Sequence, residues 1–386
     1  MKRCKRLLII VFILMLTLTS CGSELTTDGQ GDKGDYCKQS VFISGTSNLA
    51  VAPGGYYYLD TRNKNGFLTY ISKKNAKETY LCNKPECSHI DKEVRSVVEN
   101  CNAYVGTVLP RSVVYYEGYV YVLQYNADTY DVTLVRISED GSVHEELMKV
   151  GQAPEQASYY SYVFGDKSTI YMVYNAPDYT GEELSVSLEK IDLNKKEKSV
   201  IYTHRGHGAS LAYLKVQDDM VFFTQVDKGD KGYLHQLMKY DPDKKQVENV
   251  IDVHINTYTF AKEGQLFVGI PGEGVFKYDW QNDELVLFRK SDEKTMYVSL
   301  ASDGEYLYLD NMQNRFYNND NEHRVYVYDL EGNLVNEVPG GILYTEVCDY
   351  DYMFTTAHNG NGEYWTYIKK EDLRNADVTW SAVEER

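Results

Sequence analysis

The feature that most constrains this chain is a unit of about 49 residues that recurs along residues 41–386. Each unit opens with a polar turn containing Gly or Asp, which is followed by an aromatic β-run, a loop and a second β-run. The first runs are residues 56–59, 119–122, 170–173, 221–224, 266–269, 306–309 and 352–355. They are rich in Tyr, Val, Phe and Ile, which suit a pleated, half-buried surface. The unit therefore predicts an all-β fold built from small sheets.

Seven such units predict a single β-propeller of about seven four-stranded blades, with six or eight blades or two stacked β-sandwiches as alternatives. A small sheet cannot bury both faces alone, so the sheets stack radially into a ring. Pairs such as Glu117-Gly118 mark tight turns, and the segment from Asp227 to Gly232 is expected to be a hairpin turn. Residues 41–43 or 378–380 are expected to supply the strand that completes the last blade.

The first twenty residues are typical of a lipoprotein signal peptide. Four basic residues within positions 2–6 precede an apolar run over residues 7–19, which is too short to span a bilayer. Residues 18–21, Leu-Thr-Ser-Cys, resemble the lipobox of bacterial lipoproteins. The resemblance implies that cleavage leaves Cys21 first, that its thiol receives a diacylglycerol, and that the acyl chains hold the protein on the outer face of the bacterial cell membrane. An ordinary signal peptide with a chance cysteine and an uncleaved anchor are the alternatives.

The charge of the chain argues against two kinds of partner. Residues 1–20 hold four of the 40 Lys and Arg residues and none of the 57 Asp and Glu residues, so their removal changes the net charge from −17 to −21. Such an acidic chain is a poor candidate for nucleic-acid binding, and an anionic bilayer repels it. Residues 21–40, rich in Gly, Ser and Asp, are expected to be a flexible linker. We therefore expect a domain that is tethered to the membrane but does not lie on it.

Two resemblances follow from the aromatic runs and the cysteines. Tyr364-Trp365-Thr366-Tyr367 is similar to the Tyr-Trp-Thr-Asp repeat of the low-density-lipoprotein-receptor propellers, with Tyr367 in place of the Asp. Over nearly its full length the chain resembles the tyrosine-rich propeller lipoproteins of Gram-positive anaerobes, which share a lipobox, aromatic blades and a Cys-x4-Cys-x-His insertion in an early blade. This resemblance implies a surface propeller without an assigned activity.

Five of the seven cysteines lie beyond the lipobox, and three of them are close together in sequence. Cys82, Cys87, His89 and Cys101 form a cluster in an insertion at residues 82–101. Three thiolates and one imidazole at this spacing can hold a structural zinc ion. The alternatives are a disulfide, Cys82–Cys101 or Cys87–Cys101, with one thiol left over, or three free thiols.

The other two cysteines, Cys37 and Cys348, lie near opposite ends of the predicted ring, where the ends of the chain meet. A disulfide between them would close the ring. In the chain-entropy model a loop of this length contributes about 4–5 kcal/mol to stability.

Most of the 36 Tyr residues fall within β-runs, where we expect them to pack between blades. Aromatic residues placed in predicted loops are candidates for a rim that contacts a ligand. They are Tyr125, Tyr130, Tyr159, Tyr160, Tyr179, Trp280 and Tyr317.

No motif in the sequence assigns a catalytic activity. The Gly-x-Ser-x-Gly turn of a serine hydrolase is absent. We expect a non-catalytic binding or scaffold module for a protein, peptide or glycan. One alternative is a glycan-active hydrolase or lyase that uses carboxylates in the propeller funnel. A second alternative is an envelope sensor or assembly factor, since propellers host many functions.

Overall fold

The computed structural model divides the chain into two units, residues 1–31 and residues 32–386. The described residues all belong to the second unit and are 49–60, 66–87, 100–109, 112–153, 159–175, 183–229, 232–291, 299–311, 323–339, 347–348, 351–359, 362–375 and 377–384. The predicted signal peptide and linker, with Cys21, lie outside this set. Across these described ranges, the structure contains no helix with the length and apolar character needed to cross a membrane.

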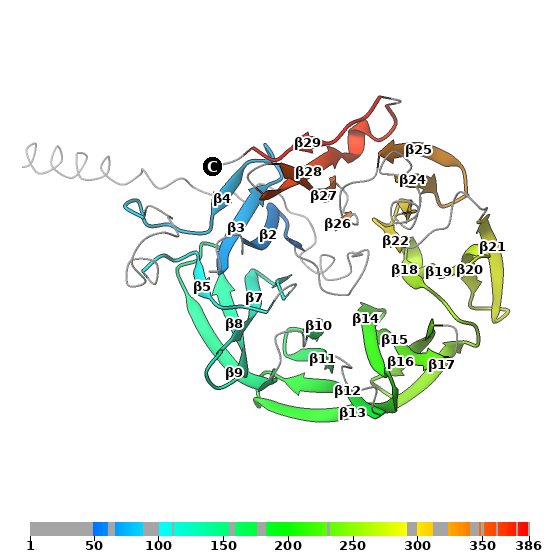
Figure 1. Ribbon diagram of the computed structural model, residues 1–386, viewed down its shortest axis with the longest axis horizontal. Helices are drawn as coiled ribbons and strands as arrows, with labels where there is room; N and C mark the ends of the chain where they lie inside the picture. Colours follow the sequence, from blue (N-terminus) through cyan, green and yellow to red (C-terminus); the bar gives the residue numbers. More distant parts are fainter. Residues whose placement is uncertain are drawn as a thin grey trace, which may run out of the picture. The chain divides into compact units, whose positions relative to one another are not determined.

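The strands form seven antiparallel sheets, which surround a common centre as the blades of a ring (Figure 1). Blade 1 contains β1 (Leu49–Val51), β2 (Gly55–Asp60), β3 (Gly66–Ser72) and β4 (Glu78–Tyr80), with β5 (Tyr104–Gly106) as an additional partner of β3. Blade 2 contains β6 (Val114–Tyr116), β7 (Tyr119–Tyr125), β8 (Asp131–Ser138) and β9 (His144–Gln152). Blade 3 contains β10 (Tyr159–Asp166), β11 (Thr169–Asn175), β12 (Glu183–Asp192) and β13 (Glu197–His207). Blade 4 contains β14 (Ser210–Gln217), β15 (Met220–Gly229), β16 (Gly232–Asp241) and β17 (Gln246–Ile251).

The remaining three blades follow the same order. Blade 5 contains β18 (Thr257–Phe260), β19 (Leu266–Ile270), β20 (Gly274–Asp279) and β21 (Glu284–Lys290). Blade 6 contains β22 (Ser299–Ser302), β23 (Tyr306–Asp310), β24 (Arg324–Asp329) and β25 (Leu334–Pro339). Blade 7 contains β26 (Val347–Cys348), β27 (Tyr352–Asn359), β28 (Gly362–Lys369) and β29 (Ser381–Ala382). Within the described residues, two short 3-10 turns, Lys262–Gly264 and Lys370–Asp372, interrupt the β structure. The predicted all-β propeller with seven four-stranded blades is thus confirmed.

The turns between consecutive strands follow the sequence signals. Glu117 and Gly118 join β6 to β7 with φ angles of 44° and 83°. Two consecutive positive φ angles are the geometry of a tight hairpin turn whose twist matches the strands, and glycine adopts it without steric cost. The segment from Asp227 to Gly232 contains the hairpin between β15 and β16, in which Gly229 pairs with Gly232. Both turn predictions are therefore confirmed.

Neighbouring blades are joined by seven clusters of buried apolar side chains, one for each junction of the ring. Tyrosine is a frequent component of these clusters. Tyr162, which is fully buried between blades 2 and 3, donates its hydroxyl to the carbonyl oxygens of Ser112 at 2.7 Å and Tyr121 at 3.1 Å. Tyrosine therefore supplies apolar area and a hydrogen bond between blades at once, which supports the packing interpretation of the tyrosine excess.

Blade 7 packs against blade 1 to close the ring. In the described ranges, no blade combines strands from the two ends of the chain. A cluster that includes Tyr56, Phe354 and Trp365 joins the two blades, and the rings of Tyr56 and Phe354 lie 4.6 Å apart. The backbone N–H of Glu384 donates to Ala76, and its carbonyl accepts from Glu78. Residues 378–380 were one of the two segments expected to complete the last blade, but the strand that does so is β29, which begins directly after them at Ser381. Residues 41–43 lie outside the described residues.

The strands of each blade define two ends of the ring. The four strands are named A to D from the centre outward in chain order (Figure 1). Because they alternate in direction, the A–B and C–D connections lie at one end, here called the A–B end. The B–C connections and the D–A connections to the next blade lie at the opposite end, here called the B–C end.

Candidate functional site

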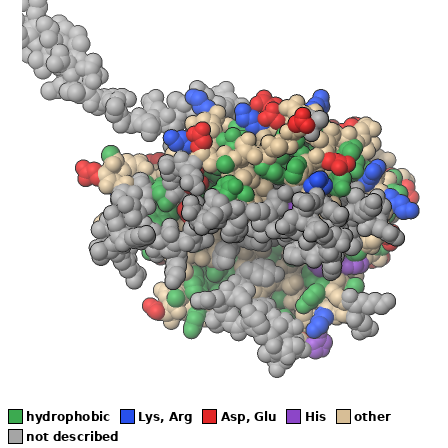
Figure 2. Space-filling view, turned by 45° about the horizontal axis from the view of Figure 1, so that its top comes forward, with side chains coloured by type: hydrophobic (Ala, Val, Ile, Leu, Met, Phe, Trp, Pro, Cys, Tyr) green, Lys and Arg blue, Asp and Glu red, His purple; other side chains and the backbone are tan. Residues whose placement is uncertain are grey.

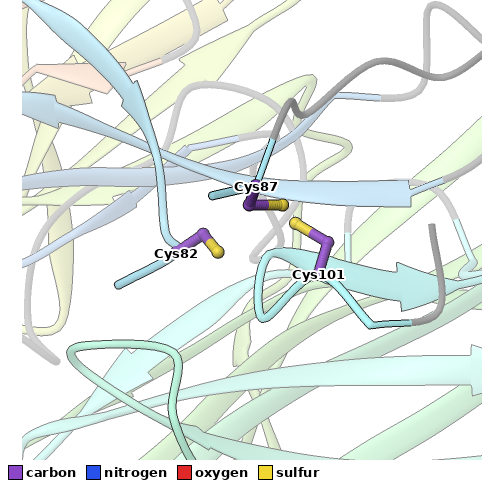
Figure 3. Close-up of side chains that lie close together, drawn as sticks. All are labelled: Cys82, Cys87 and Cys101. Atoms are coloured by element: carbon purple, nitrogen blue, oxygen red, sulfur yellow. The ribbon is translucent and has the colours of Figure 1, made fainter. Parts of the chain in front are cut away.

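The three cysteines of the insertion come together beside blade 1 at the B–C end. Cys82 and Cys87 follow β4, and Cys101 precedes β5, which returns to pair with β3. Their sulfur atoms all lie within 4.8 Å of one another, and the three side chains converge in Figure 3. All three are thiols in the structure. These positions make the cluster a possible metal site.

The cluster packs on one side against apolar side chains, with Cys82 and Cys87 half-buried, and polar contacts hold its loops in place. Cys101 and Phe67 are buried, and Tyr80 and Tyr104 pack at 5.4 Å and 5.8 Å from the Phe67 ring. The side-chain amide of Asn102 donates to Asn83 at 2.6 Å, Lys84 donates to the carbonyl of Asn100, and a ring nitrogen of His144 in blade 2 lies 2.8 Å from the carbonyl oxygen of Asn102. The two cysteine-bearing segments are thus held against each other and against blade 2.

The three sulfurs differ in their electrostatic surroundings. Burial opposes ionisation of Cys82, but the backbone N–H groups of Lys84 and Asn102 and the neighbouring thiols lower its pKa below the ordinary value. Burial, followed by the Cys87 thiol, raises the pKa of Cys101 to about 12. The thiol of Cys82 is therefore more readily ionised than that of Cys101. Three sulfurs this close together can bind a thiophilic ion, or two of them can form a disulfide.

The other predicted cysteine sites are only partly placed. His89, the fourth predicted ligand, lies outside the described residues, as do Cys37 and Cys21. Cys348 lies in β26, but its side chain is not described. The four-ligand site, the Cys37–Cys348 disulfide and lipidation at Cys21 therefore remain predictions.

The predicted aromatic rim is only partly assembled by the fold. Tyr130 lies in the B–C connection of blade 2 and is 46% exposed. Tyr125, Tyr159 and Tyr160 also lie toward the B–C end, but in strands β7 and β10, so their predicted loop placement is wrong. Trp280, although exposed, lies in the C–D connection of blade 5, at the A–B end. Trp280 therefore cannot share one rim with the others.

Tyr160 is a further correction to that rim. Its side chain is buried, its ring lies 4.8 Å from that of Tyr174, and its hydroxyl donates to the carbonyl oxygen of Gln152. An aromatic residue close to a predicted loop has instead become part of the sheet, because aromatic side chains favour strands. Tyr179 and Tyr317 lie outside the described residues.

The structure reveals a set of exposed apolar side chains at the B–C end of blade 4 that the sequence did not indicate. Strands β15 and β16 have ten residues each, whereas β19 and β20 in blade 5 have five and six. The additional residues extend the β15–β16 hairpin by about 13–17 Å, at 3.3 Å per residue. Tyr233 and Leu234 on this hairpin are 55% and 49% exposed, and Val253 in the following D–A connection is also exposed. A hairpin of this length was hidden in the sequence because the Asp, Lys and Gly residues at its tip resemble an ordinary turn.

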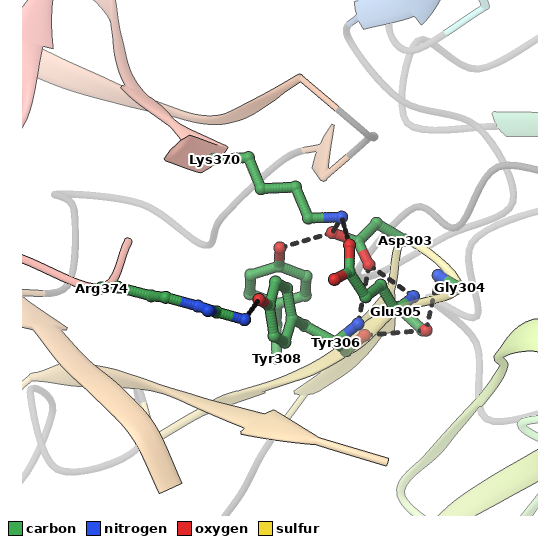
Figure 4. Close-up of polar contacts among 8 residues, drawn as sticks. Asp303, Gly304, Glu305, Tyr306, Tyr308, Lys370 and Arg374 are labelled. Atoms are coloured by element: carbon green, nitrogen blue, oxygen red, sulfur yellow. Dashed lines mark hydrogen bonds and ion pairs between the residues drawn. The ribbon is translucent and has the colours of Figure 1, made fainter. Parts of the chain in front are cut away.

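A buried charged cluster lies at the opposite, A–B end, between blades 6 and 7 (Figure 4). Lys370 contacts Asp303 at 2.7 Å and Glu305 at 3.0 Å. Asp303 also accepts hydrogen bonds from the Tyr308 hydroxyl and from the backbone N–H of Tyr306. These contacts satisfy the Asp303 carboxylate with hydrogen bonds and an ion pair. The cluster is best explained as a structural contact that fastens blade 6 to blade 7.

The described surface carries mixed charge. Lys and Arg side chains lie among Asp and Glu side chains over the upper part of the face seen in Figure 2. Several of these charges form surface ion pairs. Lys149 pairs with Asp131, and the Lys239 ammonium lies 2.7 Å from a carboxylate oxygen of Glu248. Exposed pairs of this kind contribute little to stability.

Comparison with known proteins shows the architecture. No protein-family model and no curated protein matches the chain. The chain is similar to a prolyl endopeptidase, with a TM-score of 0.57, 14% identity, and coverage of 90% of this chain and 50% of that one. It is similar to the oligogalacturonate lyase of Vibrio parahaemolyticus, with a TM-score of 0.57, 12% identity, and coverage of 85% and 90%. It is also similar to the β-propeller domain of the Trilobed protease of Pyrococcus furiosus, with a TM-score of 0.51, 9% identity, and coverage of 89% and 95%.

These similarities are to β-propellers. At such low identity they show the fold alone, and this chain spans only half the length of the matched prolyl endopeptidase. Tyr364-Trp365-Thr366-Tyr367 lies on strand β28 of blade 7, and the finer likeness to the low-density-lipoprotein-receptor propellers remains a prediction. The resemblance to propeller lipoproteins of Gram-positive anaerobes remains a prediction.

Proposed function

We propose that this chain is a lipid-anchored, extracytoplasmic β-propeller that acts as a non-catalytic binding or scaffold module and presents its B–C end to a protein, peptide or glycan. The observation that carries the proposal is the exposure of Tyr233, Leu234 and Val253 at one end of blade 4, with Tyr130 at the same end of blade 2. Exposed aromatic side chains offer apolar area and a hydroxyl together, which suits a binding surface. In this proposal the cysteine cluster is a structural part of blade 1.

The predicted location of the protein supports this arrangement. Lipidation of Cys21 would anchor the chain, and residues 21–40 would hold the ring away from the bilayer as a flexible tether. A net charge of −21 for the processed chain opposes contact between the ring and an anionic membrane. The ring would then be free to meet a ligand with its B–C end.

Membrane fractionation of cells that produce the wild-type chain or Cys21→Ala tests the anchor. We expect the wild type in the membrane fraction with an added diacylglycerol mass, and Cys21→Ala without that mass and depleted from the membrane. An unmodified Cys21 in a membrane-associated wild-type protein would contradict the proposed lipid anchor.

Covalent crosslinking in intact cells tests the binding role. We expect the wild type to capture one partner in a fixed ratio, and the double variant Tyr233→Ala/Leu234→Ala to lose it. Trp280→Ala is the matched control, because it removes an exposed aromatic residue from the A–B end. If no protein is captured, glycan binding by the purified full chain is measured with the same variants. Turnover of a glycan by the wild type would contradict a non-catalytic module.

A further inference from the structure

The geometry of the three-cysteine cluster is close to that of a metal-thiolate site. A tetrahedral zinc ion holds sulfur at about 2.3 Å, which places two sulfur ligands about 3.8 Å apart. In the structure the three sulfurs already lie within 4.8 Å of one another. Movements of about 1 Å or less would therefore bring Cys82, Cys87 and Cys101 to ligand distance.

Backbone donors around the cluster favour negatively charged sulfur. The N–H groups of Lys84 and Asn102 donate to the sulfur of Cys82, and the N–H of Ala103 donates to that of Cys101. Two of these donors lie two residues after the cysteine that they contact. N–H groups aimed at sulfur stabilise a thiolate, and they also orient it as a ligand.

A disulfide fits the surroundings less well than an ion. It would join two of the three sulfurs and give no role to the third, which lies within 4.8 Å of both. Three thiolates around a divalent ion leave a net charge of −1. Lys84, whose side chain donates to Asn100 beside Cys101, supplies one positive charge at the cluster.

We propose that Cys82, Cys87 and Cys101 bind one zinc ion, which has a structural role in fastening the 82–101 insertion to blade 1. Strand β4 pairs with β3 through three residues, and strand β5 pairs with β3 through two residues. Such short pairings hold an insertion weakly, and the ion would join the segment that leaves β4 to the segment that enters β5. The three thiolates leave one tetrahedral position for a further ligand.

Metal analysis of the full chain, extracted in detergent with a reductant and without chelator, tests this proposal. We expect about one zinc per wild-type chain and at least a tenfold loss of zinc in Cys82→Ser, Cys87→Ser and Cys101→Ser. Cys37→Ser is the matched control, since it removes a cysteine outside the cluster, and it is expected to keep its zinc. Replacement of zinc by cobalt(II) in the wild type should give the intense thiolate-to-cobalt absorption of a tetrahedral site.

The number of thiols that react with a maleimide is then measured in the native wild type. This readout does not depend on whether the serine variants fold. We expect this number to rise by three when a chelator removes the ion. The proposal is overturned if the reduced wild type holds no zinc and takes up none when zinc is added. It is also overturned if the intact mass shows a disulfide within the cluster.

Discussion

At the scale of single residues, buried polar groups explain why particular side chains occupy the junctions between blades. Tyr258 is buried in the junction of blades 4 and 5, and its hydroxyl donates to the carbonyl of Tyr213. Lys215 is half-buried beside it and donates to the carbonyl of Tyr258 at 3.0 Å and to the hydroxyl of Thr259 at 3.4 Å. Burial lowers the pKa of the Lys215 amine to about 7.

This pKa predicts how stability depends on pH. Because the unfolded Lys215 keeps an ordinary pKa near 10.4, the unfolded state binds more protons than the folded state between pH 7 and 10, so this group favours folding as pH rises. We expect the stability of the wild type relative to Lys215→Met to increase by about 1.4 kcal/mol per pH unit between pH 7.5 and 9.5. Urea unfolding at several pH values measures this difference.

The control for this prediction is Lys195→Met, which removes an exposed lysine that pairs with Asp192. Its stability relative to the wild type should not depend on pH over the same range. A flat curve for Lys215→Met as well would show that the Lys215 amine is solvated in the folded protein.

At the scale of elements, the sequence predicted the blades well and the placement of exposed residues poorly. The aromatic runs and the Glu-Gly pairs were sufficient because alternation and turn chemistry are local properties. The position of Trp280 at the A–B end depends on which connection of its blade it occupies, and that requires a correct count of strands. The burial of Tyr160 depends on Tyr174, which comes from the neighbouring strand.

The fastening between blades 6 and 7 gives a prediction at this scale. Asp303→Asn leaves the Lys370 ammonium, which is 11% exposed, without its buried carboxylate partner, so we expect a loss of about 3 kcal/mol. Glu305→Gln is the matched control, because the Glu305 side chain is 62% exposed, and it should cost less than about 1 kcal/mol. Equal losses in urea unfolding would argue against a buried ion pair.

At the scale of the whole molecule, the ring is closed in the described ranges by side-chain packing and by the backbone hydrogen bonds of Glu384, without a blade that takes strands from both ends of the chain. The contacts join residues almost 300 positions apart, such as Tyr56 with Phe354 and Tyr352 with Lys73. No local pattern in the sequence indicates such pairs, which is why the closing strand was predicted at residues 378–380 and not at Ser381–Ala382. The three-cysteine cluster was predictable, since its members are near in sequence, whereas the long β15–β16 hairpin was not.

Closure predicts that the junction of blades 7 and 1 is as well packed as the others. Phe354→Ala removes a fully buried ring at that junction, and we expect a loss of about 3–5 kcal/mol. Phe223→Ala is a matched variant, because Phe223 is equally buried at the junction of blades 3 and 4. A loss below about 1 kcal/mol for Phe354→Ala alone would indicate a ring that is open at this junction.

The central claim is that the B–C end of the ring is the surface that meets a ligand. Its most direct test is a photoreactive amino acid placed at Leu234, at the B–C end, or at Trp280, at the A–B end, in intact cells. The account predicts a specific adduct from position 234 and none from position 280. An adduct from position 280 alone, or equal adducts from both positions, would contradict it.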